Sequence, residues 1–283
     1  MRLRPKYYGL CFILPSLLGL CVFFVLPFIG SLYYTFTQGI ADPRFVGLKN
    51  FRELLLNSVF RQAAGNTFLF LIFAVPLLLG SSLLLGIIMS KRPFQWQRWA
   101  LLLPMVIPVS SLSLSWEGLW GNTGLINQII VAFGGAPVDF LYGSASFPLL
   151  ILLYLLKNIG YLAVIFTNAI LVLPVEYREG FRLDCDSELK YVCYILLPLI
   201  SPTLIFAAVV AVMNYFLMFR DIYMLCGDDP PAGIYMLQHF MNRNFYNLNY
   251  QRLSAAAFLS ILCMTLLIGL VLALQRRGIR RVG

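Results

Sequence analysis

Six long runs of apolar residues alternate with short polar segments along the whole of this chain. A helix needs roughly 20 predominantly apolar residues to cross a hydrocarbon core of about 30 Å, and every one of these runs reaches that length. The pattern therefore predicts an all-α, polytopic membrane protein with a single transmembrane domain, residues 1–283. We expect its six transmembrane helices at about residues 8–36, 64–89, 99–120, 147–173, 199–226 and 253–275.

Composition excludes a soluble globular protein. Hydrophobic residues make up 60% of the chain and charged residues only 12%, whereas about 25% of residues are charged in an average soluble domain. The mean hydropathy is +0.82. The net charge of +9 does not call for a nucleic-acid partner, because the placement of lysine and arginine across a membrane explains it.

Motifs for catalysis or cofactor binding are missing from the sequence. The six cysteines are scattered, mostly in apolar runs, without a C-x-x-C motif or a Cys/His pair, so we predict neither a metal site nor a disulfide framework. Neither G-x-x-x-x-G-K-[ST] nor G-x-G-x-x-G, which would hold nucleotide phosphates, occurs. The single histidine, His239, lies in an outer loop, where we expect a surface aromatic cluster. We therefore expect no cofactor and no enzymatic activity of this chain.

The distribution of lysine and arginine predicts the orientation in the membrane, because cytoplasmic segments carry more of them. With the N-terminus inside, thirteen lie in cytoplasmic segments and six in external loops. The first apolar run is far longer than the core of a signal peptide, which has about 7–15 residues, so we interpret it as a retained span. Both termini and residues 174–198 are therefore predicted to be cytoplasmic.

Helix-breaking residues interrupt two of the predicted spans. Proline removes a backbone hydrogen bond and kinks a helix. We expect the second span to break at Pro76 and Gly80, and the third at Pro104 and Pro108. Kinked spans suit a bundle that moves, but proline is also frequent in ordinary membrane helices.

A short polar segment, residues 174–198, separates the fourth and fifth spans and has a proline at each end. Within it, Glu176 to Arg182 and Ser187 to Tyr194 are each long enough for about two helical turns, and Ser187 is a suitable N-cap. We expect two short helices that project into the cytoplasm. The segment holds five of the twelve acidic residues of the chain, namely Glu176, Glu179, Asp184, Asp186 and Glu188.

The spacing within this segment resembles a known motif. Glu179-Gly180-Phe181, three residues, Cys185, nine residues and then Ile195-Leu196-Leu197-Pro198 resembles the E-A-A…G…I-x-L-P loop with which permeases of ABC importers dock on their ATPase subunit. We call residues 174–198 the coupling loop; the alternative is an ordinary solvated loop. The resemblance implies that the ATPase-coupling residues are Glu176, Glu179, Gly180, Phe181, Leu183, Asp184 and Cys185.

Three small residues of the family motif are replaced in this chain. Gly180-Phe181 stands where the family has Ala-Ala, and Cys185 stands where it has Gly. A positive φ at Cys185 would cost roughly 1–2 kcal/mol relative to glycine. We expect Phe181 and Leu183 to fill a hollow in the partner.

The resemblance extends over nearly the whole chain. Lys157 to Tyr161 is similar to the fourth span of carbohydrate ABC permeases, and Gly124 to Asn127 is similar to their second outer loop. The order of segments resembles the first permease of the maltose or glycerol-phosphate type pair, which implies the ABC type I importer fold in a bacterial inner membrane. It also implies three protein partners: a second homologous permease, a dimer of cytoplasmic ATP-binding subunits, and an extracytoplasmic sugar-binding protein.

Polar side chains inside the predicted spans form a second candidate site. Such groups at membrane depth usually face a bundle interior or a water-filled cavity. In the fourth span their spacings of 4, 3 and 7 residues place them on one helix face, with Lys157 beside it, while Arg220 and Asp221 lie near the outer end of the fifth span. The candidate substrate-path residues are Glu117, Tyr154, Asn158, Tyr161, Asn168 and Asn214.

Two interpretations of these polar residues stay open. A sugar path needs hydrogen-bond partners for hydroxyls and aromatic rings for pyranose faces, and these residues supply both. The same residues can instead bond to one another across packed helices, at about 0.6–2 kcal/mol each. At the level of the whole protein, the sequence favours the permease of an ATP-driven oligosaccharide or disaccharide importer. The alternative is a self-sufficient secondary carrier or channel, although no inverted repeat that would favour a carrier is seen.

Overall fold

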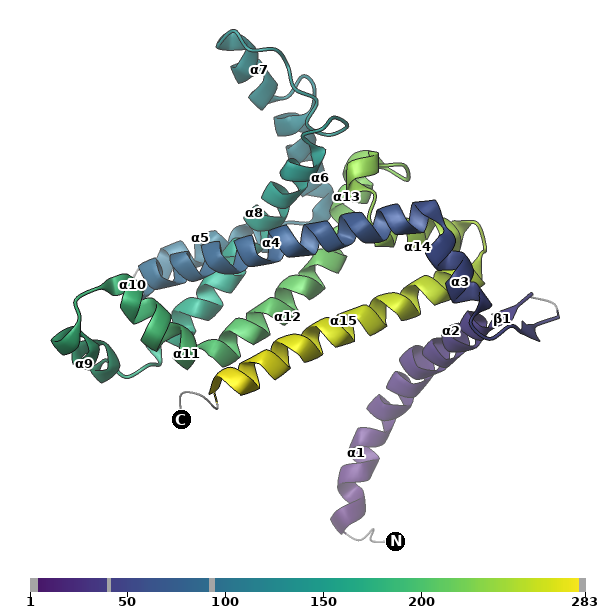
Figure 1. The fold of residues 1–283 in the computed structure, drawn as a ribbon, viewed down its shortest axis with the longest axis horizontal. Helices are drawn as coiled ribbons and strands as arrows, with labels where there is room; N and C mark the ends of the chain where they lie inside the picture. The colour runs from purple at the N-terminus through teal and green to yellow at the C-terminus, as the bar shows by residue number, and fades with distance from the viewer. Residues whose placement is uncertain (1–4, 40–41, 92–94, 280–283) are drawn as a thin grey trace. The chain divides into compact units, whose positions relative to one another are not determined.

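The computed structural model describes residues 5–39, 42–91 and 95–279, and most of them are helical (Figure 1). The chain divides into two compact units, which are described separately. The first unit comprises Met1–Arg61 and Phe240–Thr265, and the second comprises Gln62–His239 and Leu266–Gly283.

The first unit combines the N-terminal helix with the beginning of the C-terminal helix. Its elements are α1 (Pro5–Leu20), the π-helical turn η1 (Cys21–Val25), α2 (Leu26–Phe36), the antiparallel strands β1 (Thr37–Gln38) and β2 (Arg44–Phe45), α3 (Lys49–Leu56) and the first part of α15 (Tyr250–Ile279). The hydroxyl of Ser31 lies 3.1 Å from that of Ser254, and the rings of Tyr34 and Tyr250 are 6.0 Å apart, so α2 packs along α15.

The second unit contains the remaining long helices and the coupling loop. It begins within α4 (Ser58–Ser90), and α14 (Leu237–Tyr246) starts at its boundary with the first unit. Between them lie α5 (Gln95–Val106), α6 (Val109–Trp120), α7 (Leu125–Ala132), α8 (Ser146–Leu171), α9 (Glu176–Asp184), α10 (Glu188–Tyr191), the π-helical turn η2 (Val192–Leu196), α11 (Leu197–Leu199), α12 (Ser201–Leu217), α13 (Phe219–Cys226) and the 3₁₀ turn η3 (Ala232–Ile234).

Large aromatic side chains hold α4, α8 and α12 together. Phe70 of α4 is fully buried, and its ring lies 5.3 Å from that of Tyr154 and 5.0 Å from that of Tyr215. Gly160 of α8 allows α5 to approach closely, because a Cβ at this position would clash with the carbonyl oxygen of Leu101. These contacts fix α8, which leads directly into the coupling loop.

The long helices agree with the predicted membrane spans. Among the residues that the structure describes, four helical segments are long and apolar enough to cross a membrane: Phe12–Phe36, Ser58–Ser90, Ser146–Leu171 and Ser201–Cys226. A bent pair, Trp99–Val106 with Val109–Ala132, makes a fifth when it is counted as one span, and a shorter apolar stretch of α15, Tyr250–Leu266, overlaps the predicted last span. The all-α class and the multi-pass arrangement predicted from the sequence are confirmed.

The expected helix breaks are only partly present. The prediction for the second span is wrong, because α4 continues through both Pro76 and Gly80 without interruption. In the third span Pro104 lies inside α5, whereas the chain breaks next to Pro108 and bends by 92° between the two helical segments. Pro108 itself has an extended ψ of 142°, which a continuous helix does not allow.

Candidate functional site

The coupling loop consists of two short helices, as the sequence predicts. α9 ends at Asp184, and the chain then passes through an extended residue, Cys185, before α10 begins. The Ser187 hydroxyl caps α10 by accepting a 3.5 Å hydrogen bond from the backbone N–H of Lys190. Figure 1 shows α9 and α10 at the end of the second unit where α8 ends and α12 begins.

One carboxylate, that of Glu188, ties the parts of the loop together. Its Oε1 accepts hydrogen bonds from Arg178 Nη2 at 2.6 Å and from Arg182 Nη2 at 2.9 Å, both from α9. Its Oε2 lies 3.5 Å from the Nζ of Lys91, which follows the end of α4. Glu188 therefore links α10 both to α9 and to the adjacent end of a long helix. Glu188 is one of the five acidic residues of the loop but is not among the coupling residues that the resemblance implies.

The environment of Glu188 keeps it charged. The hydrogen bond from Arg178 is the main cause that lowers the pKa of Glu188 to about 2; Arg182 and Lys91 act in the same direction, and burial opposes them. Because the carboxylate stays ionised near neutral pH, the ion pairs of the loop persist there.

An aromatic contact inside the loop supports the same arrangement. The ring of Phe181 lies 5.8 Å from that of Tyr191, and the guanidinium carbon of Arg178 lies 6.0 Å from the Tyr191 ring centre. Burial raises the pKa of Tyr191. Phe181 is half-buried, and its ring packs against Tyr191 inside the loop. This contact distinguishes it from Leu183, the other residue expected to fill a hollow in a partner.

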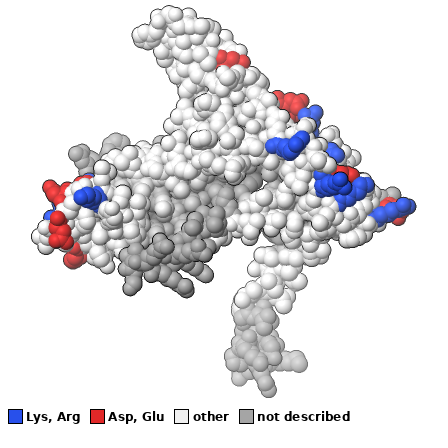
Figure 2. Space-filling view, viewed as in Figure 1, with Lys and Arg blue, Asp and Glu red and all other residues white. Residues whose placement is uncertain are grey.

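Apolar side chains of the coupling loop point into solvent. Leu183 is 89% exposed and Leu189 is 79% exposed, and Glu179 and Asp184 beside them are exposed as well. Figure 2 shows acidic and basic side chains gathered over α9 and α10. The loop thus presents a charged surface with two uncovered leucines, which is the combination expected where another protein binds.

The replaced small residues of the motif fit the backbone without strain. Cys185 has φ −157°, an extended conformation that any residue adopts, so the predicted cost of a positive φ does not arise. A Cβ added at Gly180 would meet nothing within 4 Å, so glycine is not required there. Glu176 is exposed at the first turn of α9.

Three of the six candidate path residues form one bonded cluster. Asn214 of α12 donates a 2.8 Å hydrogen bond to Asn158 Oδ1 of α8. The Asn158 side-chain amide in turn donates to the Tyr154 carbonyl oxygen at 2.8 Å, and the Tyr154 hydroxyl donates to the Ala211 carbonyl oxygen at 2.6 Å. Tyr154 and Asn158 are buried, whereas Asn214 is half-buried. Two of these hydrogen bonds join α8 to α12, as expected for polar side chains that bond across packed helices.

The other three candidate path residues are not part of this cluster. Tyr161 is half-buried on α8, Asn168 is exposed near the end of α8, and Glu117 is exposed on α6. Ser110 and Ser113 share the face of Glu117 in the sequence pattern, but the side chain of Ser113 is outside the described part of the structure.

A buried ion pair next to the cluster was not predicted. Lys157 Nζ of α8 lies 2.8 Å and 2.7 Å from the two carboxylate oxygens of Asp221 on α13, and Asp221 is only 3% exposed. Both residues were noticed in the sequence as polar groups within spans. Their pairing could not be deduced, because 64 residues separate them. We call Tyr154, Lys157, Asn158, Asn214 and Asp221 the membrane cluster.

The expected position of the single histidine is wrong. His239 is buried, not part of a surface cluster, and its ring centre lies 4.9 Å from that of Phe219. Its Nδ1 accepts a 3.2 Å hydrogen bond from the backbone N–H of Met236. Burial lowers the pKa of His239 to about 4, so the imidazole is neutral at physiological pH and helps to fix the segment before α14.

Comparisons with known proteins agree with this geometry. A family model described as "Binding-protein-dependent transport system inner membrane component" matches residues 82–282. The probable ABC transporter permease protein YesP of Bacillus subtilis (strain 168) is 26% identical over 277 residues, which cover 94% of this chain and 90% of that protein. The trehalose/maltose transport system permease protein MalF of Thermococcus litoralis is 25% identical over 285 residues, which cover 98% of this chain and 96% of that protein.

A solved structure has the same fold. A chain of a bacterial ABC transporter involved in the import of the acidic polysaccharide alginate aligns with a TM-score of 0.76 and 19% sequence identity, over 96% of both chains. The family model covers more than half of this chain. This multi-pass membrane protein therefore belongs to the family of inner membrane components of binding-protein-dependent transport systems.

Proposed function

We propose that this chain is the first permease subunit of an ATP-driven importer for an oligosaccharide or disaccharide. The observation that carries the proposal is the coupling loop, in which a fixed pair of helices presents Leu183 and Leu189 to solvent. The trehalose/maltose permease that matches nearly the whole chain supports a carbohydrate as the cargo. A second permease, a dimer of ATP-binding subunits and an extracytoplasmic sugar-binding protein complete the proposed importer.

The loop is built to transmit movement. Because Glu188 bonds to α9 and also lies next to Lys91, a force on α9 or α10 reaches the end of α4 as well as α8 and α12. Closure of the ATPase dimer would displace the loop, and the attached helices would rock to open the cavity outward. We propose that residues 1–283 form one transmembrane domain. Its helices would shift as rigid bodies during this movement.

The orientation that places this loop in the cytoplasm, with both termini, follows from the lysine and arginine distribution. Single cysteines at positions 49 and 243, on a cysteine-free background, should react with an impermeant maleimide from outside intact cells. A cysteine at position 188 should react only after permeabilisation. Labelling of position 188 from outside would exclude the proposed docking role.

We propose that some of the candidate substrate-path residues line the sugar path. Tyr154 and Asn158 are buried and make hydrogen bonds that hold α8 against α12. Asn214 and Tyr161 are only half-buried, so they are more accessible to a solute. We therefore assign sugar contacts to Asn214 and Tyr161 first, with Asn168 and Glu117 as more exposed positions along the same route.

Reconstitution tests the proposed function. The complex with its ATPase, in proteoliposomes with the binding protein outside, should accumulate labelled maltose-type saccharides only when ATP is enclosed with the ATPase. A vanadate-treated sample is the matched control. Uptake by this chain alone, driven by a proton or sodium gradient without ATP, would instead establish a secondary carrier.

A further inference from the structure

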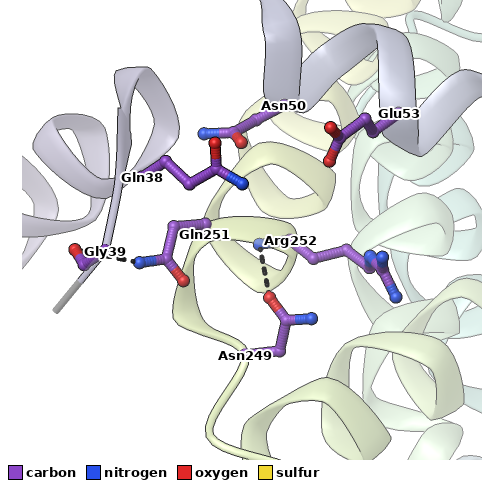
Figure 3. A pocket seen from close by; sticks show the side chains of 7 residues that line it. All are labelled: Gln38, Gly39, Asn50, Glu53, Asn249, Gln251 and Arg252. Carbon is purple, nitrogen blue, oxygen red and sulfur yellow. Dashed lines mark hydrogen bonds between the residues drawn. The ribbon is translucent and has the colours of Figure 1, made fainter. Parts of the chain in front are cut away.

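A polar pocket in the first unit is not used by the coupling loop or by the membrane cluster. It has a volume of about 250 Å³ and opens between the β1 strand end, α3 and the start of α15 (Figure 3). Four amide side chains and two charged side chains line it: Gln38, Asn50, Asn249, Gln251, Glu53 and Arg252. On the proposed orientation, this pocket faces the outside of the cell.

Half of the amide groups are occupied by bonds that shape the pocket. Asn50 donates to the carbonyl oxygens of Thr35 and Thr37, both at 2.9 Å, and this buried amide anchors α3 to the end of α2. Gln251 donates to the Gly39 carbonyl oxygen at 3.3 Å, which ties α15 to the strand end. The walls of the pocket are therefore held in place without a ligand.

The other polar groups keep free hydrogen-bonding capacity. Gln38 uses its carbonyl oxygen for Lys49 at 3.0 Å, which leaves its N–H groups free, and Asn249 uses its Oδ1 for the Arg252 backbone. Among the residues that the structure describes, the guanidinium of Arg252 makes no hydrogen bond or ion pair. Figure 3 shows it extending from the start of α15 away from Asn249. An unpaired guanidinium beside free amide donors favours a carboxylate ligand.

The chemistry of the pocket favours a peptide over a sugar. None of the described residues that line it carries an aromatic ring, so a pyranose ring would lack a surface for stacking. Primary amides offer both donors and acceptors and match the backbone of a peptide. The polar segments of this unit, residues 37–61 and 240–252, contain six basic and two acidic residues, so an acidic partner is attracted to this face.

We propose that this pocket receives an acidic loop of the extracytoplasmic sugar-binding protein, with Arg252 bound to a carboxylate of that loop. This inference rests on the proposed function, because it requires an importer that is served by a binding protein. It assigns a docking role to residues that the coupling-loop resemblance does not include. Charge attraction to the basic face would speed the encounter, and the pocket would fix its register.

Biolayer interferometry on the nanodisc-embedded complex with the purified binding protein of the same importer tests this inference. Arg252→Glu should weaken binding at least tenfold, because it places two carboxylates opposite each other. Arg61→Glu, which makes the same change of charge in the same unit outside the pocket, should change affinity less than twofold. ATPase activity without the binding protein should be the same for both variants and the wild type.

A second measurement does not depend on the Arg252 variant. A Gln251→Cys variant on a cysteine-free background should react with an impermeant maleimide at least fivefold more slowly when the binding protein is bound. Equal affinities of all variants for the binding protein, or no protection at position 251, would overturn the docking inference. ATP-driven uptake by the wild type would still support the proposed function in that case. Binding of free saccharide that Arg252→Glu abolishes would also overturn it, in favour of a sugar site. A wild-type complex that neither binds the binding protein nor imports saccharide would contradict both proposals.

Discussion

The coupling loop and the membrane cluster contain similar kinds of polar residues but use them differently. In the loop, the charges of Glu188 and its arginine partners are partly exposed, and large apolar side chains such as Leu183 face water. In the membrane cluster, Asp221 is 3% exposed, and each of its carboxylate oxygens bonds to Lys157. The charged groups of the membrane cluster are paired within the chain, whereas the coupling loop leaves charged and apolar side chains partly exposed.

The difference shows what polar residues contribute in each solvent. The charges of the loop are partly exposed, so its ion pairs contribute little stability, and we propose that they set the shape of a surface for a partner. The membrane offers no water to an unpaired charge, so the cluster must be paired before the helices can pack. A polar residue within a span is therefore evidence of a tie between helices unless its bonding capacity remains free.

The largest effect should come from breaking the buried ion pair. Asp221→Ala leaves Lys157 unpaired at membrane depth and should destabilise the protein by about 3–5 kcal/mol. The thermal midpoint of the detergent-purified protein, followed by size-exclusion chromatography, measures the loss. The double variant Lys157→Met with Asp221→Leu should recover most of it, because neither charge remains. An unchanged midpoint in Asp221→Ala would show that the pair does not hold α8 to α13.

A smaller effect is expected from the amide pair. Asn158→Ala removes the acceptor of Asn214 and should cost about 0.6–1.7 kcal/mol, which are the average and the largest values for hydrogen bonds between membrane helices. Asn168→Ala, at an exposed position of the same helix, is the matched control and should leave the thermal midpoint unchanged. Equal effects of the two substitutions would indicate that the Asn158–Asn214 bond adds nothing to packing.

The smallest effect concerns the pH dependence of the loop. The pKa of Glu188 is lowered to about 2, so the unfolded chain binds this proton at higher pH than the folded protein does. The stabilisation is therefore complete above about pH 4.5 and is lost as the pH falls toward 2. Because Glu188 is 43% exposed, we expect only about 0.2–1 kcal/mol.

The thermal midpoint of the wild type should exceed that of Glu188→Gln between pH 5 and 8, and the gap should close in acid. Glu179→Gln, which replaces an exposed carboxylate of the same loop, should show no such gap. A constant difference between wild type and Glu188→Gln down to about pH 2 would mean that the charge of Glu188 is not what holds the loop.

Local patterns in the sequence were sufficient to predict the long helices and the two short helices of the coupling loop. Apolar runs of about 20 residues predicted the long helices, and Ser187 marked the start of α10, because these signals depend on neighbouring residues only. The predicted break at Pro76 is wrong, because whether a proline breaks a membrane helix depends on the packing of neighbouring helices. The sequence also did not predict the extended backbone at Cys185, because this conformation depends on how α9 ends.

Contacts between distant residues were beyond the sequence pattern. Lys157 and Asp221, or Glu188 and Lys91, meet only after several helices pack, and no spacing rule connects them. The same limit applies to Phe181, which was expected to fill a hollow in the partner together with Leu183. Its size suggested a role at the surface, but only the structure shows that its ring packs on Tyr191 and that Leu183 is the more exposed residue.

The most direct test of the coupling loop is the amount of ATPase that copurifies with Leu183→Asp. At 89% exposed, Leu183 can be changed without disturbing the loop, whereas Phe181→Ala would also remove the contact with Tyr191. If Leu183 is a central contact, the substitution should cost about 2 kcal/mol or more, which is roughly a 30-fold loss of affinity. Leu125→Asp, at an exposed leucine of α7, should retain full ATPase binding. Undiminished copurification and saccharide-stimulated ATP hydrolysis in Leu183→Asp would contradict the assignment of this loop as the ATPase-docking element.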